Sequence, residues 1–120
     1  MNTGIHLIGD LYGCGFSPLL QSEKKVEELK KLISKKIEET GLTELGNFYH
    51  YFSPDALTAV ICLSESHISF HTWADEKYTS LDVFVCNYQK DNTGKARIIF
   101  DYLVKEVFRP TESKKQEIER

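Results

Sequence analysis

The sequence predicts an α+β fold, a two-layer α/β sandwich in which two helices cover one face of a mostly antiparallel sheet. The chain has 120 residues, which fits a single domain over residues 1–120 with one modest core. Its 41% hydrophobic and 28% charged residues are typical of a soluble globular protein. Four successive stretches with strand patterning lie between two with helical patterning, and strands that follow one another directly usually pair antiparallel.

The N-terminal third contains one predicted strand and one predicted helix. Residues 5–12 are mostly apolar and end at Gly13-Cys14-Gly15, which indicates a strand followed by a turn. Ser22 is a suitable N-cap, and Gly41 is the residue type that commonly follows a helix. Between them, apolar residues recur at helical spacing: Val26, Leu29, Ile33 and Ile37. An amphipathic helix is therefore expected over Glu23 to Thr40.

The middle of the chain predicts four strands. They are expected over residues 48–52, 57–63, 67–73 and 78–86. Side chains alternate between the two faces of a strand, so one face of the last strand carries three apolar residues that the helices can cover: Leu81, Val83 and Val85. The opposite face carries His71, Trp73 and Cys86, and we expect it to be wet or covered by another subunit.

The C-terminal part predicts a second helix and an ambiguous tail. Apolar residues recur at helical spacing over Lys95 to Val107: Ala96, Ile99, Phe100, Leu103 and Val107. Pro110 is expected to end this helix. Residues 111–120 are polar, and their composition favours helix or disorder over a strand.

Charge and composition argue against two classes of partner. The formal net charge is −3, and the lysines near residues 24–36 are interleaved with glutamates, so nothing indicates a nucleic-acid site. No apolar run reaches the length of a membrane span and no secretory signal is evident, so we expect a cytoplasmic protein without a membrane partner. The three cysteines, Cys14, Cys62 and Cys86, match neither a disulfide framework nor a zinc spacing.

An unusual polar segment, residues 63–73, lies between apolar strands and contains three serines, two histidines and a tryptophan. A zinc site is disfavoured, because His67 and His71 would lie roughly 13 Å apart along a strand. A serine-hydrolase triad is disfavoured too, since the G-x-S-x-G turn is absent. From the pattern alone, a strand with a polar outer face remains the simplest interpretation.

The same segment also resembles a known family. Residues 65–73, Glu-Ser-His-Ile-Ser-Phe-His-Thr-Trp, followed by Tyr78 and by residues 81–86, Leu-Asp-Val-Phe-Val-Cys, resemble the core signature of S-adenosylmethionine decarboxylase in its short bacterial and archaeal form. Residues 10–14 and 52–54 resemble the family's first two strands. The resemblance covers nearly the whole chain and is weakest after Pro110.

The resemblance implies a self-processing proenzyme. Ser66 Oγ would attack the carbonyl of Glu65, and cleavage between these residues would leave a β chain of residues 1–65 and an α chain of residues 66–120. Ser66 would become a pyruvoyl group, the only cofactor implied; no metal is. Such a ketone forms a Schiff base with a substrate amine and delocalises the negative charge that decarboxylation leaves, as pyridoxal phosphate does.

The resemblance also implies roles for three other side chains. His71 would shuttle protons during processing, because imidazole exchanges protons near neutral pH. Cys86 would protonate the α-carbon once carbon dioxide has left. Thr58 stands where the family usually has a serine that assists processing, and threonine keeps the hydroxyl. Because Ser66 and His71 have opposite strand parity, we expect the cleavage site at a turn or bulge that re-aims Ser66.

The substrate is less narrowly defined than the mechanism. Phe52 and Trp73 match aromatic residues that line the family's substrate site, in a homodimer whose active sites lie at the subunit interface. The family usually has Trp-Pro-Glu where this chain has Trp73-Ala74-Asp75, so Asp75 would offer the ribose hydroxyls a shorter carboxylate. S-adenosylmethionine, used for spermidine synthesis, is the first choice of small-molecule substrate. Arginine or ornithine is the alternative, and a non-cleaving regulatory relative is a third interpretation.

Overall fold

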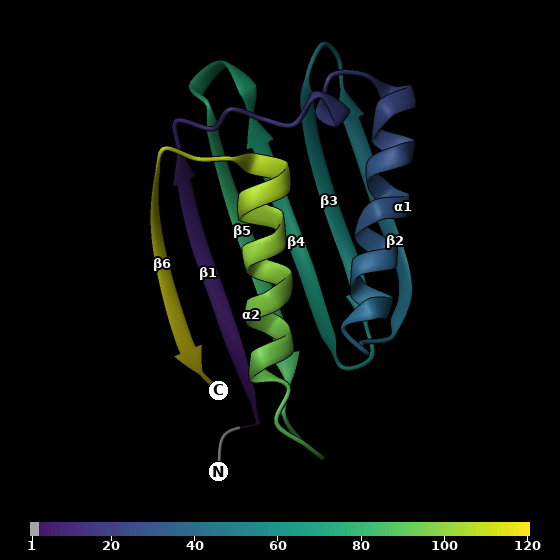
Figure 1. The fold of residues 1–120 in the computed structure, drawn as a ribbon, viewed down its shortest axis with the longest axis vertical. Coiled ribbons are helices and arrows are strands. Elements are labelled where there is room, and N and C mark those ends of the chain that lie inside the picture. Colours follow the sequence, from purple (N-terminus) through teal and green to yellow (C-terminus); the bar gives the residue numbers. More distant parts are fainter. Residues whose placement is uncertain (1–2) are drawn as a thin grey trace.

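The computed structural model describes residues 3–120, which form one six-stranded antiparallel sheet with two helices packed on one face (Figure 1). The strand order is β2-β3-β4-β5-β1-β6. The strands are β1 (Gly4–Tyr12), β2 (Glu44–Phe52), β3 (Ala56–Leu63), β4 (Ser66–Trp73), β5 (Tyr78–Cys86) and β6 (Glu112–Glu119). The helices are α1 (Glu23–Glu39) and α2 (Thr93–Tyr102). The predicted α+β sandwich with both helices on one face is therefore confirmed.

The core lies between the sheet and the two helices. The four apolar residues at helical spacing in α1 are all buried, as are Leu81, Val83 and Val85 on β5. Phe70 on β4 and Phe108 are the largest fully buried side chains, and their ring centroids lie 5.0 Å apart in an edge-to-face arrangement. Each such buried side chain stabilises the fold by roughly 1.5–3 kcal/mol, so this layer holds the helices against the sheet.

The ends of α1 match the sequence prediction, and α2 begins at Thr93, two residues before the expected Lys95. Ser22 Oγ accepts a hydrogen bond of 3.1 Å from the backbone N–H of Lys25, which satisfies a free donor in the first turn of α1. Gly41 follows α1 with a φ of +84°, a conformation that favours glycine. Helix α2 continues as one π-helical segment, Leu103–Phe108, and the left-handed Arg109 ends it just before Pro110.

The tail departs from the prediction of helix or disorder. Strand β6 pairs antiparallel with β1 from Ile5–Glu119 to Tyr12–Glu112 and forms an edge of the sheet. Every residue of β6 is exposed, so the apolar alternation that marks a strand is missing from its sequence. Its pairing with β1 and a bidentate hydrogen-bonded ion pair between Arg97 and Glu117 hold it in place.

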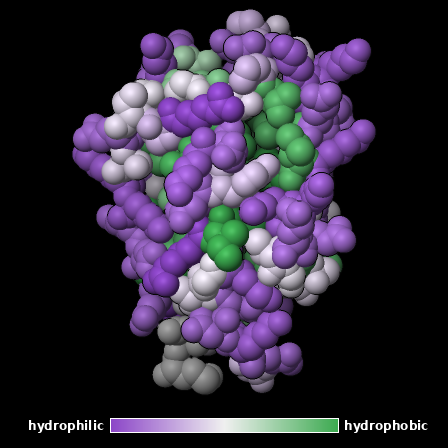
Figure 2. Space-filling model, viewed as in Figure 1, coloured by the Kyte–Doolittle hydropathy of each residue, from purple (hydrophilic) through white to green (hydrophobic). Residues whose placement is uncertain are grey.

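The two faces of the molecule differ in character. Hydrophilic residues dominate the helix side, which Figure 2 shows. On the opposite face of the sheet, Phe48, Phe52, Val60 and Trp73 are exposed. All four histidines of the chain lie on this same face by strand register: His6, His50, His67 and His71. Within residues 3–120, no helix is both long and apolar enough to cross a membrane.

Candidate active site

Ser66 lies directly after a tight turn. Ser64 and Glu65 form the two-residue connection between β3 and β4, and Leu63 pairs with Ser66 across it. Glu65 has a φ of +59°, which is uncommon for a residue other than glycine. The predicted scissile bond therefore joins a left-handed turn residue to the first residue of β4.

The Ser66 hydroxyl and the Cys86 thiol lie next to each other at the same end of the sheet. The backbone N–H of Cys86 donates a hydrogen bond of 2.9 Å to Ser66 Oγ. The Cys86 thiol points its proton towards Glu65 Oε2, with 3.8 Å between sulfur and oxygen. The same sulfur accepts a hydrogen bond of 3.3 Å from the backbone N–H of Tyr88. Glu65, Ser66 and Cys86 together are called the serine cluster below.

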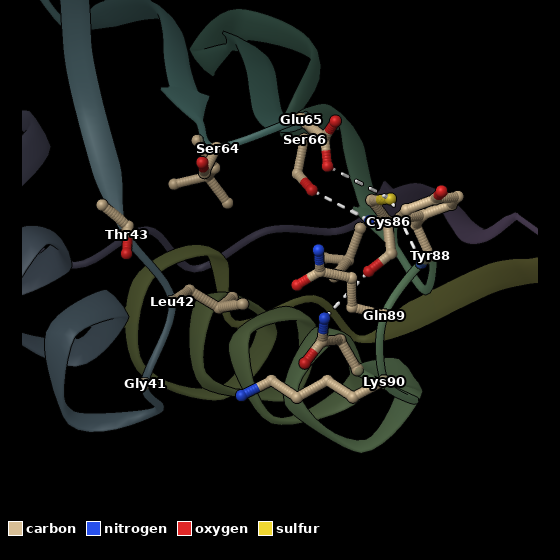
Figure 3. A pocket seen from close by; sticks show the side chains of 13 residues that line it. Gly41, Leu42, Thr43, Ser64, Glu65, Ser66, Cys86, Tyr88, Gln89 and Lys90 are labelled. Carbon is tan, nitrogen blue, oxygen red and sulfur yellow. Dashed lines mark hydrogen bonds between the residues drawn. The ribbon is translucent and has the colours of Figure 1, made fainter.

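The serine cluster opens onto a pocket of about 530 Å³, a size that suits a small molecule. The side chain of Ser66 points into it in Figure 3, beside Cys86. The other walls come from the loop after α1 and from the loop between β5 and α2: Gly41, Leu42, Thr43, Tyr88, Gln89, Lys90 and Asn92. Asn92 Nδ2 donates to the backbone carbonyl of Cys86 at 2.8 Å, which ties this loop to the end of β5.

A second group of predicted residues lies together at the other end of the sheet. Thr58 pairs with His71 across β3 and β4, and Thr58 Oγ1 lies 3.0 Å from His71 Nδ1. The ring centroids of His71 and Trp73 lie 5.9 Å apart. Phe52 ends β2, and Asp75 lies in the short 3₁₀ turn just after Trp73. Phe52, Thr58, His71, Trp73 and Asp75 are called the histidine cluster below.

The structure does not bring the two clusters together within one chain. Ser66 and His71 are at different ends of β4, and five residues of strand span roughly 17 Å. The pairing of β3 with β4 runs without a shift from Leu63–Ser66 to Thr58–His71. The expected turn is present, but the expectation that it re-aims Ser66 towards His71 of the same chain is wrong, because the two-residue turn keeps the strand register regular.

Two polar pairs on the exposed face were not singled out from the sequence. Tyr78 stacks on Trp73 with centroids 5.3 Å apart and donates a hydrogen bond of 2.5 Å to Asp10. This hydrogen bond is the largest of the effects that together raise the pKa of Tyr78 to about 12. His6 Nε2 lies 2.7 Å from Asp82 Oδ1. No sequence pattern marks such pairs, because each joins strands that are distant in the chain.

The charged side chains of the described chain do not form a metal centre. Among residues 3–120, no group of three or more histidine, cysteine, aspartate and glutamate side chains is arranged to hold a metal ion. His67 and His71, the pair considered from the sequence, lie on the same face of β4 but four residues apart.

Comparison with known proteins agrees with the fold and with the sequence signature. The sequence model of the S-adenosylmethionine decarboxylase family matches residues 5–120. A crystal structure of the adenosylmethionine decarboxylase from Aquifex aeolicus superposes with a TM-score of 0.77 at 30% identity, covering 99% of this chain and 91% of that one.

Curated relatives give the same result. An S-adenosylmethionine decarboxylase proenzyme from a Sulfurihydrogenibium species is 37% identical over 102 residues, which is 85% of this chain and 71% of the relative. The proenzyme from Picrophilus torridus is 33% identical over 118 residues, which is 98% of this chain and 84% of the relative. The fold and these matches define the protein as a decarboxylase, a type of lyase. More specifically, the chain belongs to the S-adenosylmethionine decarboxylase family.

Proposed function

We propose that this chain cuts itself between Glu65 and Ser66 and then acts as a pyruvoyl-dependent S-adenosylmethionine decarboxylase, whose product donates aminopropyl groups for spermidine synthesis. The observation that carries the proposal is the position of Ser66. It directly follows a left-handed turn residue, and its Oγ is held by the N–H of Cys86. Membership of a family whose relatives are described as proenzymes supports it further.

The processing chemistry uses atoms that lie close together. Ser66 Oγ attacks the carbonyl carbon of Glu65, the C–N bond breaks, and an ester joins the two residues. Loss of the Cα proton of residue 66 then breaks the Cβ–Oγ bond and releases Glu65 as a carboxylate. Addition of water with loss of ammonia converts the remaining dehydroalanine to a pyruvoyl group at the start of the α chain.

The residues present fit a pyruvoyl group at position 66. The side chain of Ser66 points into a pocket that accepts a small molecule, so a ketone there would be accessible. The group would supply an electron sink for decarboxylation. The thiol of Cys86 lies beside this position and is the chain's candidate to return a proton to the substrate α-carbon.

Two subunits would complete each active site. The serine and histidine clusters are at opposite ends of the sheet. A site at either end of one chain therefore has only one of the two clusters. A twofold axis perpendicular to the strands, with the exposed sheet faces packed together, would bring the partner subunit's His71 to the end of the sheet where Ser66 lies. The same operation creates a second, identical site and covers Phe48, Phe52, Val60 and Trp73.

The histidine cluster would recognise the substrate. Trp73 is 43% exposed and stacks on Tyr78, and Phe52 is exposed nearby at the end of β2, so both could contact a flat ring such as adenine. The Asp75 carboxylate is exposed in the 3₁₀ turn, where it accepts a hydrogen bond of 3.0 Å from the N–H of Glu76. Its shorter reach than the family's usual glutamate is the specific feature that favours arginine or ornithine as the second candidate substrate.

Two measurements test the proposal. Intact-mass analysis of the purified protein should give two chains divided between residues 65 and 66, and a single chain after long incubation would exclude the enzyme and leave a non-cleaving relative. The processed protein would then be incubated separately with S-adenosylmethionine, arginine and ornithine while carbon dioxide is measured. Release from only the amino acids would replace the first substrate by the second. We also propose a cytoplasmic location, which cell fractionation tests.

A further inference from the structure

We propose that Lys90 and Lys95 form a carboxylate-binding site that captures the new C-terminus of Glu65 after self-cleavage and so withdraws Glu65 from the Cys86 thiol. This inference rests on the cleavage proposed above. Processing creates one new carboxylate in the protein, at the end of the β chain. The serine cluster shares its pocket with Lys90, and within residues 3–120 neither Lys90 nor its neighbour Lys95 forms an ion pair with a carboxylate.

Lys90 lines this pocket, and Lys95 lies beside Gly41 at its edge. Figure 3 shows the side chain of Lys90 extending towards Gly41, across the pocket from Glu65 and Ser66. Lys95 comes from the first turns of α2, and its Nζ would lie 3.1 Å from a Cβ built on Gly41. The ammonium groups of both lysines are therefore on the same side of the pocket as Gly41.

The lysine pair lacks a balancing charge. Among residues 3–120, no carboxylate lies within ion-pair distance of either ammonium group. The pKa of the Lys95 ammonium is lowered, first by its side-chain contact with Lys90 and then by desolvation, as expected for a cation beside another cation without a counter-charge. In the same pocket wall, Asn92 Oδ1 is buried without a hydrogen-bond donor, and a lysine ordered by a carboxylate could supply one.

The cut end of the β chain would be free to move within the pocket that Lys90 lines. In the uncut protein, Glu65 is held in a left-handed conformation between two paired strands. Cleavage frees Ser64 and Glu65 as a tail that pivots at Leu63, and two extended residues span roughly 7 Å before the terminal carboxylate is counted. Release also removes the conformational constraint on Glu65, which costs about 1–3 kcal/mol when a residue is held in such a region.

Movement of this tail would have a functional effect on Cys86. In the uncut chain the Glu65 carboxylate accepts a contact of 3.8 Å from the Cys86 thiol. Capture of the tail on the lysine side would withdraw Glu65 from the thiol and open the space in front of residue 66. The lysine site would thereby couple completion of the cut to access for the substrate.

The test compares the same substitution in cut and uncut protein. Lys90→Met is made in the wild-type chain and in Ser66→Ala, which cannot cleave, and the thermal unfolding midpoint of each is measured. In the cut protein we expect the midpoint to fall by about 2–5 °C, the shift that loss of one ion pair gives in a domain of this size. In Ser66→Ala the change should be about 1 °C or less, because Glu65 has no terminal carboxylate there.

Two controls separate charge from other effects. Lys90→Arg keeps the charge and should retain the midpoint of the cut wild type, and Lys105→Met removes an exposed lysine elsewhere and should shift both backgrounds equally. As a second measurement, the rate of alkylation of Cys86, followed by mass spectrometry of its own peptide, should rise on cleavage and fall again in cut Lys90→Met. Equal midpoint shifts in the two backgrounds, with normal cleavage, would overturn the lysine site alone. An uncut wild-type chain in the mass measurement would overturn the proposed function and this inference with it.

Discussion

The backbone N–H of Cys86 donates its hydrogen bond to the hydroxyl oxygen of Ser66, with 2.9 Å between nitrogen and oxygen. This contact joins the first residue of β4 to the last residue of β5. It leaves the hydroxyl proton of Ser66 free to be removed, because the oxygen acts only as the acceptor. It also holds the main chain of Cys86 beside residue 66, so under the proposed function the same two residues would take part first in cleavage and later in decarboxylation.

Ser66→Ala should abolish cleavage. Without the hydroxyl no ester can form, and the protein should remain one chain of 13.8 kDa in intact-mass analysis. The matched control is Ser64→Ala, two residues away in the same turn, which should still give two chains. Cleavage of Ser66→Ala at an unchanged position would show that another residue is the nucleophile.

Cys86→Ala should separate cleavage from turnover. The N–H that holds Ser66 belongs to the backbone, so processing should continue, while loss of the proton donor should lower the decarboxylation rate by about 10²–10⁴. Carbon dioxide release from processed protein measures the effect. Cys62→Ala removes the exposed cysteine on β3 and should keep wild-type turnover. A processed Cys86→Ala protein with full activity would remove the thiol from the mechanism.

Cleavage should be restored between two defective subunits. His71→Asn should process slowly because it lacks the proton shuttle, and Ser66→Ala should not process at all. A mixed dimer would contain one complete site, made of Ser66 from the first variant and His71 from the second. Mass analysis should then show cleavage of the His71→Asn chain only. His6→Asn, a histidine on the same face that contacts Asp82 and belongs to neither cluster, should cleave normally. Failure of the mixture, despite mixed dimers in native mass spectrometry, would contradict the interface site.

Phe70→Ala should destabilise the fold strongly. Phe70 is fully buried and contacts Phe108 edge to face, so its removal leaves a cavity between the sheet and the end of the second helical segment. We expect a loss of about 3–5 kcal/mol in the free energy of unfolding, measured by urea denaturation of the uncut Ser66→Ala background. Ile98→Ala, which truncates an exposed residue of α2, should cost less than about 0.5 kcal/mol.

Tyr78 should make the fold sensitive to alkaline pH. Its hydrogen bond to Asp10 raises its pKa to about 12 from an ordinary value of 10.0, so the folded state keeps the proton longer than the unfolded state does. The stability from this pair is complete below pH 10 and is lost as the pH rises towards 12. Thermal midpoints measured over this range should fall less steeply in Tyr78→Phe than in the wild type. Parallel curves would exclude the pair as the cause.

The elements that bury an apolar stripe could be predicted from the sequence, and the tail could not. Helix α1 and strand β5 bury apolar side chains at a regular spacing, so the spacing of apolar residues in the sequence indicates which face is buried. Strand β6 has no inner face. It is held by main-chain pairing to β1 and by the Arg97–Glu117 pair, neither of which leaves a period in the sequence.

The site was predictable as a set of residues but not as an arrangement. The family signature identifies Ser66, His71 and Cys86 together, because they are close in the sequence or in register. Ser66 and His71 are separated because five residues of extended strand lie between them. The two-residue turn before Ser66 keeps the pairing of β3 with β4 regular, so it does not shorten this distance. Lys90 and Lys95 belong to no signature, and their common position near Gly41 is visible only once the loop after α1 and the start of α2 are placed in space.

The order of the strands gives the proposed cut a lasting consequence. Residues 1–65 contribute β1, β2 and β3, and residues 66–120 contribute β4, β5 and β6, yet β1 lies between β5 and β6. The two products are thus interleaved within one sheet, and neither has a complete set of neighbours without the other. Once cut and unfolded, the protein could recover its fold only by a second-order encounter of two peptides, so its refolding would become dependent on concentration where that of the uncut chain is not.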